Sequence, residues 1–88
     1  MDLRIAIGDK VRYMRMKMRL SQEELALKAG TSQKTICRIE HYAQNTSADL
    51  LDKLGHGLGI PTYTLLTELN EQEYTRLCQW TDSCPAER

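Results

Sequence analysis

The segment from Ser21 to Glu40, SQEELALKAGTSQKTICRIE, constrains the fold most, because it contains two short amphipathic helices separated by one glycine. Ser21 followed three residues later by Glu24 forms a capping box, which marks the N-terminus of a helix. The apolar side of that helix consists of Leu25, Ala26 and Ala29. Gly30 can adopt the left-handed conformation that ends a helix. Two such helices joined by a short glycine turn form a helix-turn-helix and cross at a steep angle.

Helical periodicity extends over most of the chain, and no strand alternation interrupts it. The helix before this segment has an apolar stripe at Ile7, Val11, Met14 and Met18. Thr31 or Ser32 caps the third helix, whose inner side carries Ile36 and Ile39. Ser47 caps a fourth helix, which contains Leu50, Leu51, Leu54 and Leu58. A fifth helix begins at Pro61 or Thr62 and carries Leu65, Leu66 and Leu69. A second capping box, Asn70 with Glu73, starts a sixth helix with Tyr74, Leu77 and Trp80.

The sequence GHGLG, Gly55 to Gly59, contains the spacing GxGxG. A phosphate-binding loop requires a preceding strand and a following helix start, and here the glycines lie late in a helical pattern. We therefore expect close helix packing at Gly55 and Gly57, and a helix end at Gly59.

The composition indicates one small globular domain. The chain has 88 residues, of which 41% are hydrophobic and 27% charged. No apolar run approaches the roughly 20 residues that cross a bilayer, and the N-terminus lacks a secretory signal, so we expect a cytoplasmic protein. Cys37, Cys78 and Cys84 have no spacing typical of a zinc site. We expect reduced thiols and no metal.

Charge is divided unevenly along the chain, although the formal net charge is zero. Residues 1–41 contain nine Lys or Arg and five Asp or Glu, whereas residues 42–88 contain three and seven. This division suggests one basic surface suited to a polyanion and a second surface with another use. Ordinary scatter of surface charge is the alternative.

The outer side of the third helix carries Gln33, Lys34 and Arg38. Glutamine can pair with adenine, and arginine or lysine with guanine, in the major groove of DNA. The first residues of a recognition helix reach base edges. These side chains therefore suit base reading; a solvated helix face is the alternative.

The sequence IGDKVRYMRMKMRLSQEELALKAGTSQKTICRIE, followed by LLDKLGHGLGIPTYTLL, resembles the XRE family of phage Cro and CI repressors. Its most specific parts are SQEELA, the AGTS turn, the IxRIE run and the LG[IV]P step. The resemblance covers Ile7 to about Leu66. It implies an all-α, compact five-helix lambda-repressor-like helix-turn-helix domain at residues 1–69. Residues 70–88 add a C-terminal helix and tail.

By this resemblance, the third helix reads bases through Gln33, Lys34 and Arg38. The resemblance also implies contacts with the DNA backbone from Gln22 and Arg15, and from Ser32 and Thr35 with the backbone or a thymine methyl. His41 and Asn45, in the loop after the third helix, are further candidates for hydrogen bonds to the backbone. Arg15 and Glu40 occupy positions that often form a partly buried ion pair, in which Glu40 is structural. Losing Glu40 would leave a partly buried arginine unpaired.

Three features depart from the family pattern. The loop HYAQNTSAD lacks the usual Lys or Arg directed at phosphate, which should make the dependence of affinity on salt shallow. Arg19 occupies the place of a glycine that usually ends the first helix, so that turn is strained or built differently. The third departure is an apolar tail, for which we expect a dimer contact through Leu65, Leu66, Tyr74, Leu77 and Trp80. A sixth helix folded back on its own core is the alternative.

The functional hypothesis is a homodimeric transcription regulator, a repressor or controller, that binds a palindromic operator in double-stranded DNA. We expect no cofactor, no small-molecule ligand and no membrane. An antitoxin-type module that grips a protein and also binds DNA is the rival. An enzyme is disfavoured because His41 and His56 belong to no recognisable catalytic constellation. For Cys37, an inert small side chain is preferred to an oxidation sensor.

Overall fold

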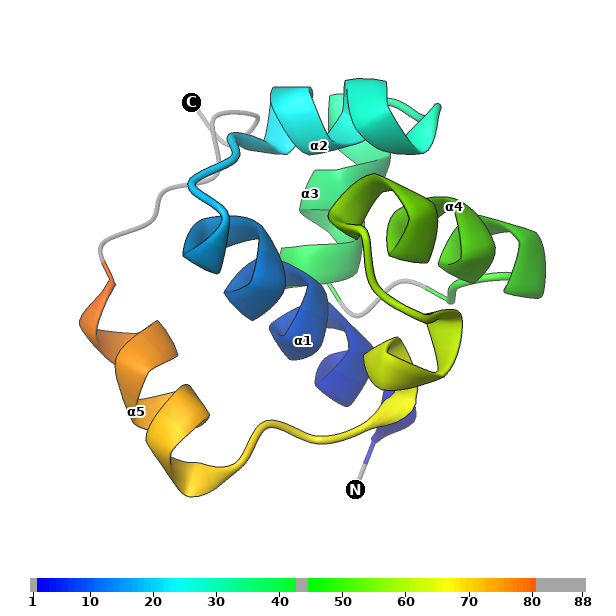
Figure 1. The fold of residues 1–88 in the computed structure, drawn as a ribbon. Helices are drawn as coiled ribbons and strands as arrows, with labels where there is room; N and C mark the ends of the chain where they lie inside the picture. The colour runs from blue at the N-terminus through cyan, green and yellow to red at the C-terminus, as the bar shows by residue number, and fades with distance from the viewer. Residues whose placement is uncertain (1, 43–44, 81–88) are drawn as a thin grey trace.

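The computed structural model describes residues 2–42 and 45–80 of the chain, and these residues form an all-α structure (Figure 1). The helices are α1 (Leu3–Lys17), α2 (Gln22–Ala29), α3 (Gln33–His41), α4 (Ala48–Leu58), the 3₁₀ helix η1 (Thr62–Leu66) and α5 (Glu71–Gln79). The predicted all-α fold class is confirmed. None of the helices in the described residues has the length and apolar character needed to traverse a lipid bilayer.

Helix α1 runs through the centre of the molecule and contacts α3, α4, η1 and α5 (Figure 1). Helix α2 packs on α3 and α4 at one end of α1. The buried core draws on every helix from α1 to η1, and consists of Ile7, Val11, Leu25, Ala26, Ala29, Ile36, Ile39, Leu54, Leu58 and Leu65. The predicted apolar stripes supply this core, except that Met18 after α1 and Leu66 in η1 are exposed.

Glycines allow three close approaches between segments. A Cβ atom on Gly8 of α1 would collide with the carbonyl oxygen of Ile39 in α3. In α4, a Cβ on Gly57 would lie 3.0 Å from the Ala29 nitrogen, and one on Gly55 would lie 3.0 Å from the Ile60 carbonyl oxygen. The prediction of close packing at Gly55 and Gly57 is confirmed.

Three helices end in the same way, in a left-handed residue whose successor donates its N–H to a carbonyl five residues earlier. Gly30 (φ 74°) ends α2 and Gly59 (φ 70°) ends α4, as predicted. At the end of α1 the left-handed residue is Arg19, with φ 60°. The turn after α1 therefore keeps the geometry that glycine favours and bears the steric cost of a side chain, about 1–2 kcal/mol.

The predicted fifth helix is shorter and tighter than its apolar pattern suggested. It is the 3₁₀ helix η1, and the backbone is extended at Thr67 immediately after it. The Thr67 hydroxyl donates to the Thr64 carbonyl oxygen at 2.7 Å. Threonine has low helix propensity, which explains why Leu69 lies outside the helix.

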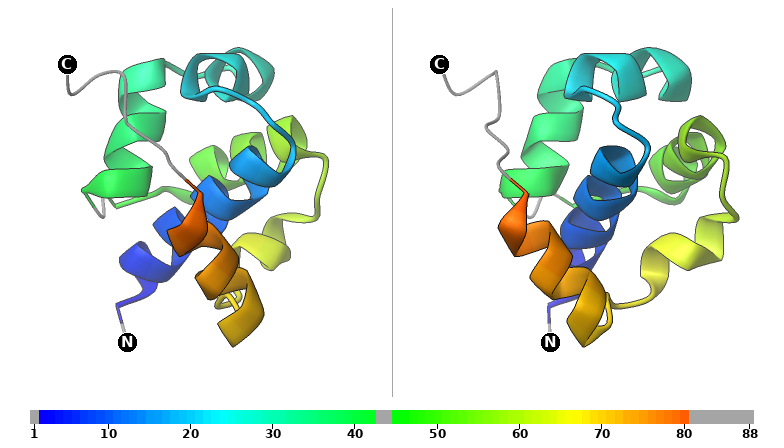
Figure 2. Two further views of the ribbon diagram at one scale, coloured as in Figure 1. Left: turned by 90° about the vertical axis from the view of Figure 1, so that its left-hand side faces the viewer. Right: turned by 60° about the vertical axis from the view of Figure 1, so that its left-hand side comes forward.

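Helix α5 packs on α1, on the side opposite to α4 (Figures 1 and 2). Leu77 is buried, and the rings of Trp80 and Tyr13 stack with centroids 5.4 Å apart. The buried Lys10 side chain lies 3.9 Å from the Glu73 carboxylate. The second capping box forms as predicted and fixes the start of α5 at Asn70.

Candidate nucleic-acid interface

Helix α3 has a buried side and an exposed side. Ser32 caps it by accepting a hydrogen bond from the Thr35 N–H at 3.2 Å. Ile36 and Ile39 face the core and are fully buried. The exposed side presents Lys34 and Arg38, with the half-buried Gln33 between that side and the core.

The charged side chains on the exposed side of α3 make no polar contacts with the other described residues. Among the described residues, no hydrogen bond or ion pair involves the side chains of Gln33, Lys34 or Arg38. The three side chains that the sequence assigns to base reading therefore come from one helix and keep their hydrogen-bonding groups for another molecule.

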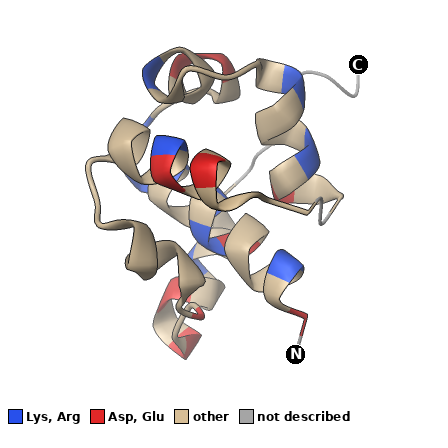
Figure 3. Ribbon diagram, turned by 90° about the vertical axis from the view of Figure 1, so that its right-hand side faces the viewer, with Lys and Arg blue, Asp and Glu red and all other residues tan. Residues whose placement is uncertain are grey.

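The exposed charged residues of α3 are basic, and Figure 3 shows the Lys and Arg positions along this helix in blue. The first turns of α2, α4 and α5 each contain an acidic residue, whereas the first turn of α3 contains none. Free N–H groups and the helix dipole favour an anion at such an N-terminus. The start of α3 is therefore suited to phosphate.

A buried polar network lies at the other end of α3. The Arg15 guanidinium donates to both oxygens of Glu40, at 2.7 and 3.0 Å, and also to the Leu20 carbonyl oxygen at 2.7 Å. The Gln22 amide donates to Glu40 at 3.2 Å. The ion pair that the family resemblance implies is present, and it joins α1, α2 and α3 at one carboxylate.

Two residues expected to touch the DNA backbone belong instead to this network. Gln22 is 2% exposed and Arg15 is 4% exposed. Their polar groups point to Glu40 rather than to solvent, because the buried carboxylate requires donors. In this conformation neither side chain presents a surface that a phosphate could reach.

The remaining candidates for backbone contact lie around the ends of α3. Ser32 is exposed, and its hydroxyl is 2.9 Å from that of the half-buried Thr35. Asn45 is exposed in the segment before α4. The Nε2 atom of His41 is buried without a hydrogen-bond partner among the described residues. The sites at Ser32, Thr35 and Asn45 are therefore open, and that at His41 is partly covered.

The residues expected at a dimer contact divide into two groups. Leu65 and Leu77 are buried within the chain, and Trp80 stacks on Tyr13 of the same chain. Leu66 and Tyr74 are 45% and 52% exposed. This placement favours the alternative expectation, in which the last helix folds back on its own core. Only Leu66 and Tyr74, among the expected dimer residues, remain exposed.

The cysteines differ from one another. Cys78 is an exposed free thiol, whereas Cys37 is buried and disulfide-bonded, so the expectation of a reduced thiol is wrong at Cys37. Cys84 lies outside the described residues. No cluster of three or more His, Cys, Asp or Glu side chains suited to a metal ion occurs in the part of the chain that the structure describes.

Sequence reasoning missed one residue that positions α3, and it did not identify the partner of one residue that positions α5. Gly8 lets α1 approach α3 closely, and Tyr13 supplies the ring on which Trp80 stacks. A signal existed for the glycine, because glycine inside a helix costs about 1 kcal/mol relative to alanine and implies a packing reason.

A short helix, a turn closed by a left-handed glycine and a second helix with a polar outer side define the helix-turn-helix class. A helix-turn-helix family model matches residues 11–65, which is more than half of the chain. The protein therefore belongs to this family, in its XRE branch, as the sequence motifs indicated.

Two relatives and one solved structure illustrate the similarity. The transcriptional regulator SinR of Bacillus licheniformis is 36% identical over 69 residues, which cover 77% of this chain and 62% of SinR. The control protein C.BamHI of Bacillus amyloliquefaciens is 35% identical over 66 residues, covering 74% of this chain and 82% of C.BamHI. The restriction-modification controller protein C.AhdI from Aeromonas hydrophila superimposes with a TM-score of 0.68 at 29% identity, covering 70% and 94% of the two chains. The chain thus spans less than two thirds of the length of SinR.

Proposed function

We propose that the protein is a sequence-specific DNA-binding transcription regulator that inserts α3 into the major groove. The observation that carries this proposal is the exposed side of α3, where base-reading side chains protrude without intramolecular partners. An α-helix fits the major groove of B-form DNA, and its first residues reach the base edges. The family membership of the chain agrees with this use of the helix.

Within that arrangement each side chain has a distinct role. Gln33, Lys34 and Arg38 read base edges. Ser32 and Thr35 meet the DNA backbone at the N-terminus of α3. His41 meets it from the last residue of α3, and Asn45 from the segment that follows. Arg15, Gln22 and Glu40 hold α3 against α1 and α2 and set the angle at which it enters the groove.

We further propose that two copies bind together and read a palindrome. Two recognition helices related by a two-fold axis fit half-sites one helical turn, about 34 Å, apart. Leu66 and Tyr74 are the expected dimer residues that remain exposed for a second copy. We propose that such a protein acts in the cytoplasm as a repressor or controller. Among its relatives, SinR is named a transcriptional regulator and C.BamHI a control protein.

Selection from random double-stranded DNA at low salt, followed by gel shifts, tests the proposal. We expect an enriched palindromic motif, and a complex whose mobility corresponds to two protein copies. The double variant Lys34→Ala/Arg38→Ala should abolish enrichment, while Lys53→Ala on α4 should preserve it. Failure of the unmodified protein to enrich any motif would contradict the proposal. A protein that co-purifies with the chain would favour the antitoxin-type alternative.

A further inference from the structure

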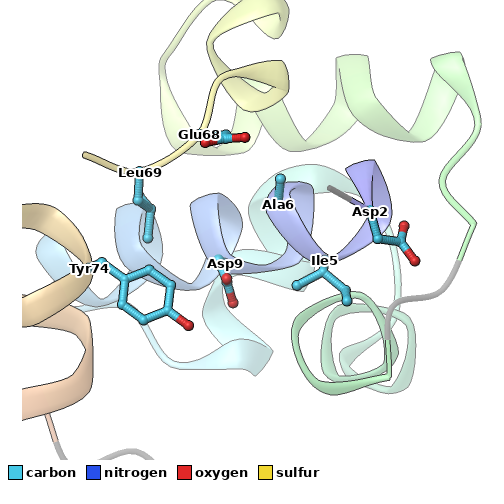
Figure 4. A pocket seen from close by; sticks show the side chains of 7 residues that line it. All are labelled: Asp2, Ile5, Ala6, Asp9, Glu68, Leu69 and Tyr74. Carbon is cyan, nitrogen blue, oxygen red and sulfur yellow. The ribbon is translucent and has the colours of Figure 1, made fainter. Parts of the chain in front are cut away.

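A pocket of about 270 Å³ lies between the first half of α1, the segment before α5 and the start of α5 (Figure 4). It is lined by Asp2, Ile5, Ala6, Asp9, Glu68, Leu69 and Tyr74. Figures 1 and 2 place this region at the end of the molecule away from α2. The pocket is thus separate from the DNA-reading side proposed for α3, and its ligand chemistry does not depend on base reading by that helix. It does include Tyr74, which is also proposed for the dimer contact.

The lining combines an apolar floor with a carboxylate in its middle. Ile5, Ala6 and Leu69 supply hydrocarbon, and the Tyr74 ring stands beside Asp9, as Figure 4 shows. A cation next to an aromatic ring gains cation–π attraction in addition to the attraction of a carboxylate. These surfaces together complement a positive charge carried on a hydrocarbon stem.

The three carboxylates of the lining are not equivalent. Asp2 accepts hydrogen bonds from the backbone and side chain of Arg4, at 2.9 to 3.3 Å, so its charge is already balanced. Neither Asp9 nor Glu68 has a hydrogen-bond or ion-pair partner among the described residues. Two negative charges therefore remain for a ligand.

Among the carboxylates of the lining, a cationic ligand would stabilise the ionised form of Asp9 most. Burial raises the pKa of Asp9, and the nearby Arg12 offsets only part of this effect. A half-buried carboxylate without a hydrogen-bond donor has lost solvation without gaining a partner. An ammonium group placed in the pocket would supply that partner.

Size and chemistry narrow the class of ligand. The volume lies just below the roughly 300–1,000 Å³ of pockets that hold drug-sized molecules, so the occupant is small. The described carboxylates do not cluster as metal ligands, and a hydrated inorganic ion would leave the apolar floor unused. An anion is disfavoured by Asp9 and Glu68.

We propose that this pocket binds a small alkylammonium group, whose charge meets Asp9 and whose carbon chain lies on Ile5, Ala6 and Leu69. Glu68 at the rim and the Tyr74 ring add attraction for the same charge. The group belongs either to a free aliphatic amine or to a lysine side chain of a partner. This assignment departs from the expectation that the protein has no small-molecule ligand.

The assignment is tested by titrating small probes into the full chain at constant ionic strength and monitoring the amide NMR shifts. The probes are n-butylammonium, 1-butanol and butyrate, which share a carbon chain and differ in charge. We expect saturable shifts at Ile5, Ala6, Asp9 and Tyr74 with butylammonium, and at least tenfold weaker binding of the other two probes. Equal binding of 1-butanol, or no saturable shift with butylammonium, would overturn the proposal.

Substitutions and the pH dependence of binding test whether Asp9 is the carboxylate that binds the ammonium group. Asp9→Asn should weaken butylammonium binding at least fivefold, while Glu23→Gln on α2 should leave it unchanged. Because burial raises the pKa of Asp9, binding by the unmodified protein should weaken on acidification from a higher pH than for an ordinary aspartate. An unchanged affinity in Asp9→Asn would overturn the role of Asp9. Tighter binding of a capped lysine than of butylammonium would assign the group to a partner protein, and the reverse order to a free amine.

Discussion

The inner and outer sides of α3 are held in different ways. On the inner side, Ile36 and Ile39 are packed in the core and Glu40 accepts donors from α1 and α2. On the outer side, the side chains of Lys34 and Arg38 make no polar contact with the described residues. One nine-residue helix can thus separate stability from recognition, so that the outer residues can change without loss of the fold.

The sharpest test of this separation is Glu40→Ala. Removing the carboxylate takes away the counter-charge of the buried Arg15 and should lower the free energy of unfolding by about 3–5 kcal/mol. Urea denaturation followed by circular dichroism measures the loss. Lys34→Ala, on the outer side of the same helix, is the matched control and should change stability by less than about 0.5 kcal/mol. Equal losses in the two variants would remove the distinction between the sides.

Gly8→Ala tests the inner side from α1. The added Cβ collides with the backbone of Ile39, which cannot rotate away as a side chain could. We expect a destabilisation of about 3 kcal/mol, read from the same denaturation experiment. Gly30→Ala is the control, because a Cβ there has open space and the cost comes from its positive φ alone, about 1–2 kcal/mol. A Gly8 variant more stable than the Gly30 variant would show that α1 and α3 are not held at this spacing.

Arg38→Ala tests the outer side. It should relax preference at one base position and weaken operator binding by about 1–3 kcal/mol. Unfolding stability should stay within about 0.5 kcal/mol. Gel shifts on an operator and its single-base variants measure the first effect, with Lys53→Ala as the control. If binding to all sequences weakened equally, Arg38 would be assigned to phosphate contact instead of base reading.

The smallest effect is expected where the inner network meets the α1–α2 turn. Arg15 donates a hydrogen bond to the Leu20 carbonyl oxygen, and Arg19, the residue before Leu20, has a left-handed backbone conformation. Arg19→Gly should therefore raise the free energy of unfolding by about 1 kcal/mol. Met18→Gly, at a right-handed position, should lower it by about the same amount. A loss of stability in Arg19→Gly would mean that the arginine side chain contributes more than its backbone conformation costs.

Features fixed by neighbours in the sequence were predictable. The capping boxes at Ser21 and Asn70 and the left-handed ends at Gly30 and Gly59 depend on residues three to five positions away. The exposed position of Arg38 follows from helical periodicity in the same way. These features place the helix-turn-helix without any knowledge of tertiary contacts.

Features fixed by distant partners were not predictable. Gln22 at a helix start resembles a solvent-exposed residue until Glu40, eighteen positions later, comes within hydrogen-bonding distance. The apolar side of α5 indicated burial but not its partner, and both a second copy and α1 would satisfy it. The structure shows contact with α1, where the ring of Tyr13 stacks on that of Trp80.

The Tyr13–Trp80 stack provides a natural spectroscopic reporter. Trp80 is the only tryptophan of the chain, and it lies immediately after α5. Its emission therefore follows the docking of that helix, while far-ultraviolet circular dichroism follows all helices at once. If the emission changes at a lower urea concentration than the dichroism, α5 detaches as a separate cooperative unit before the rest of the fold opens.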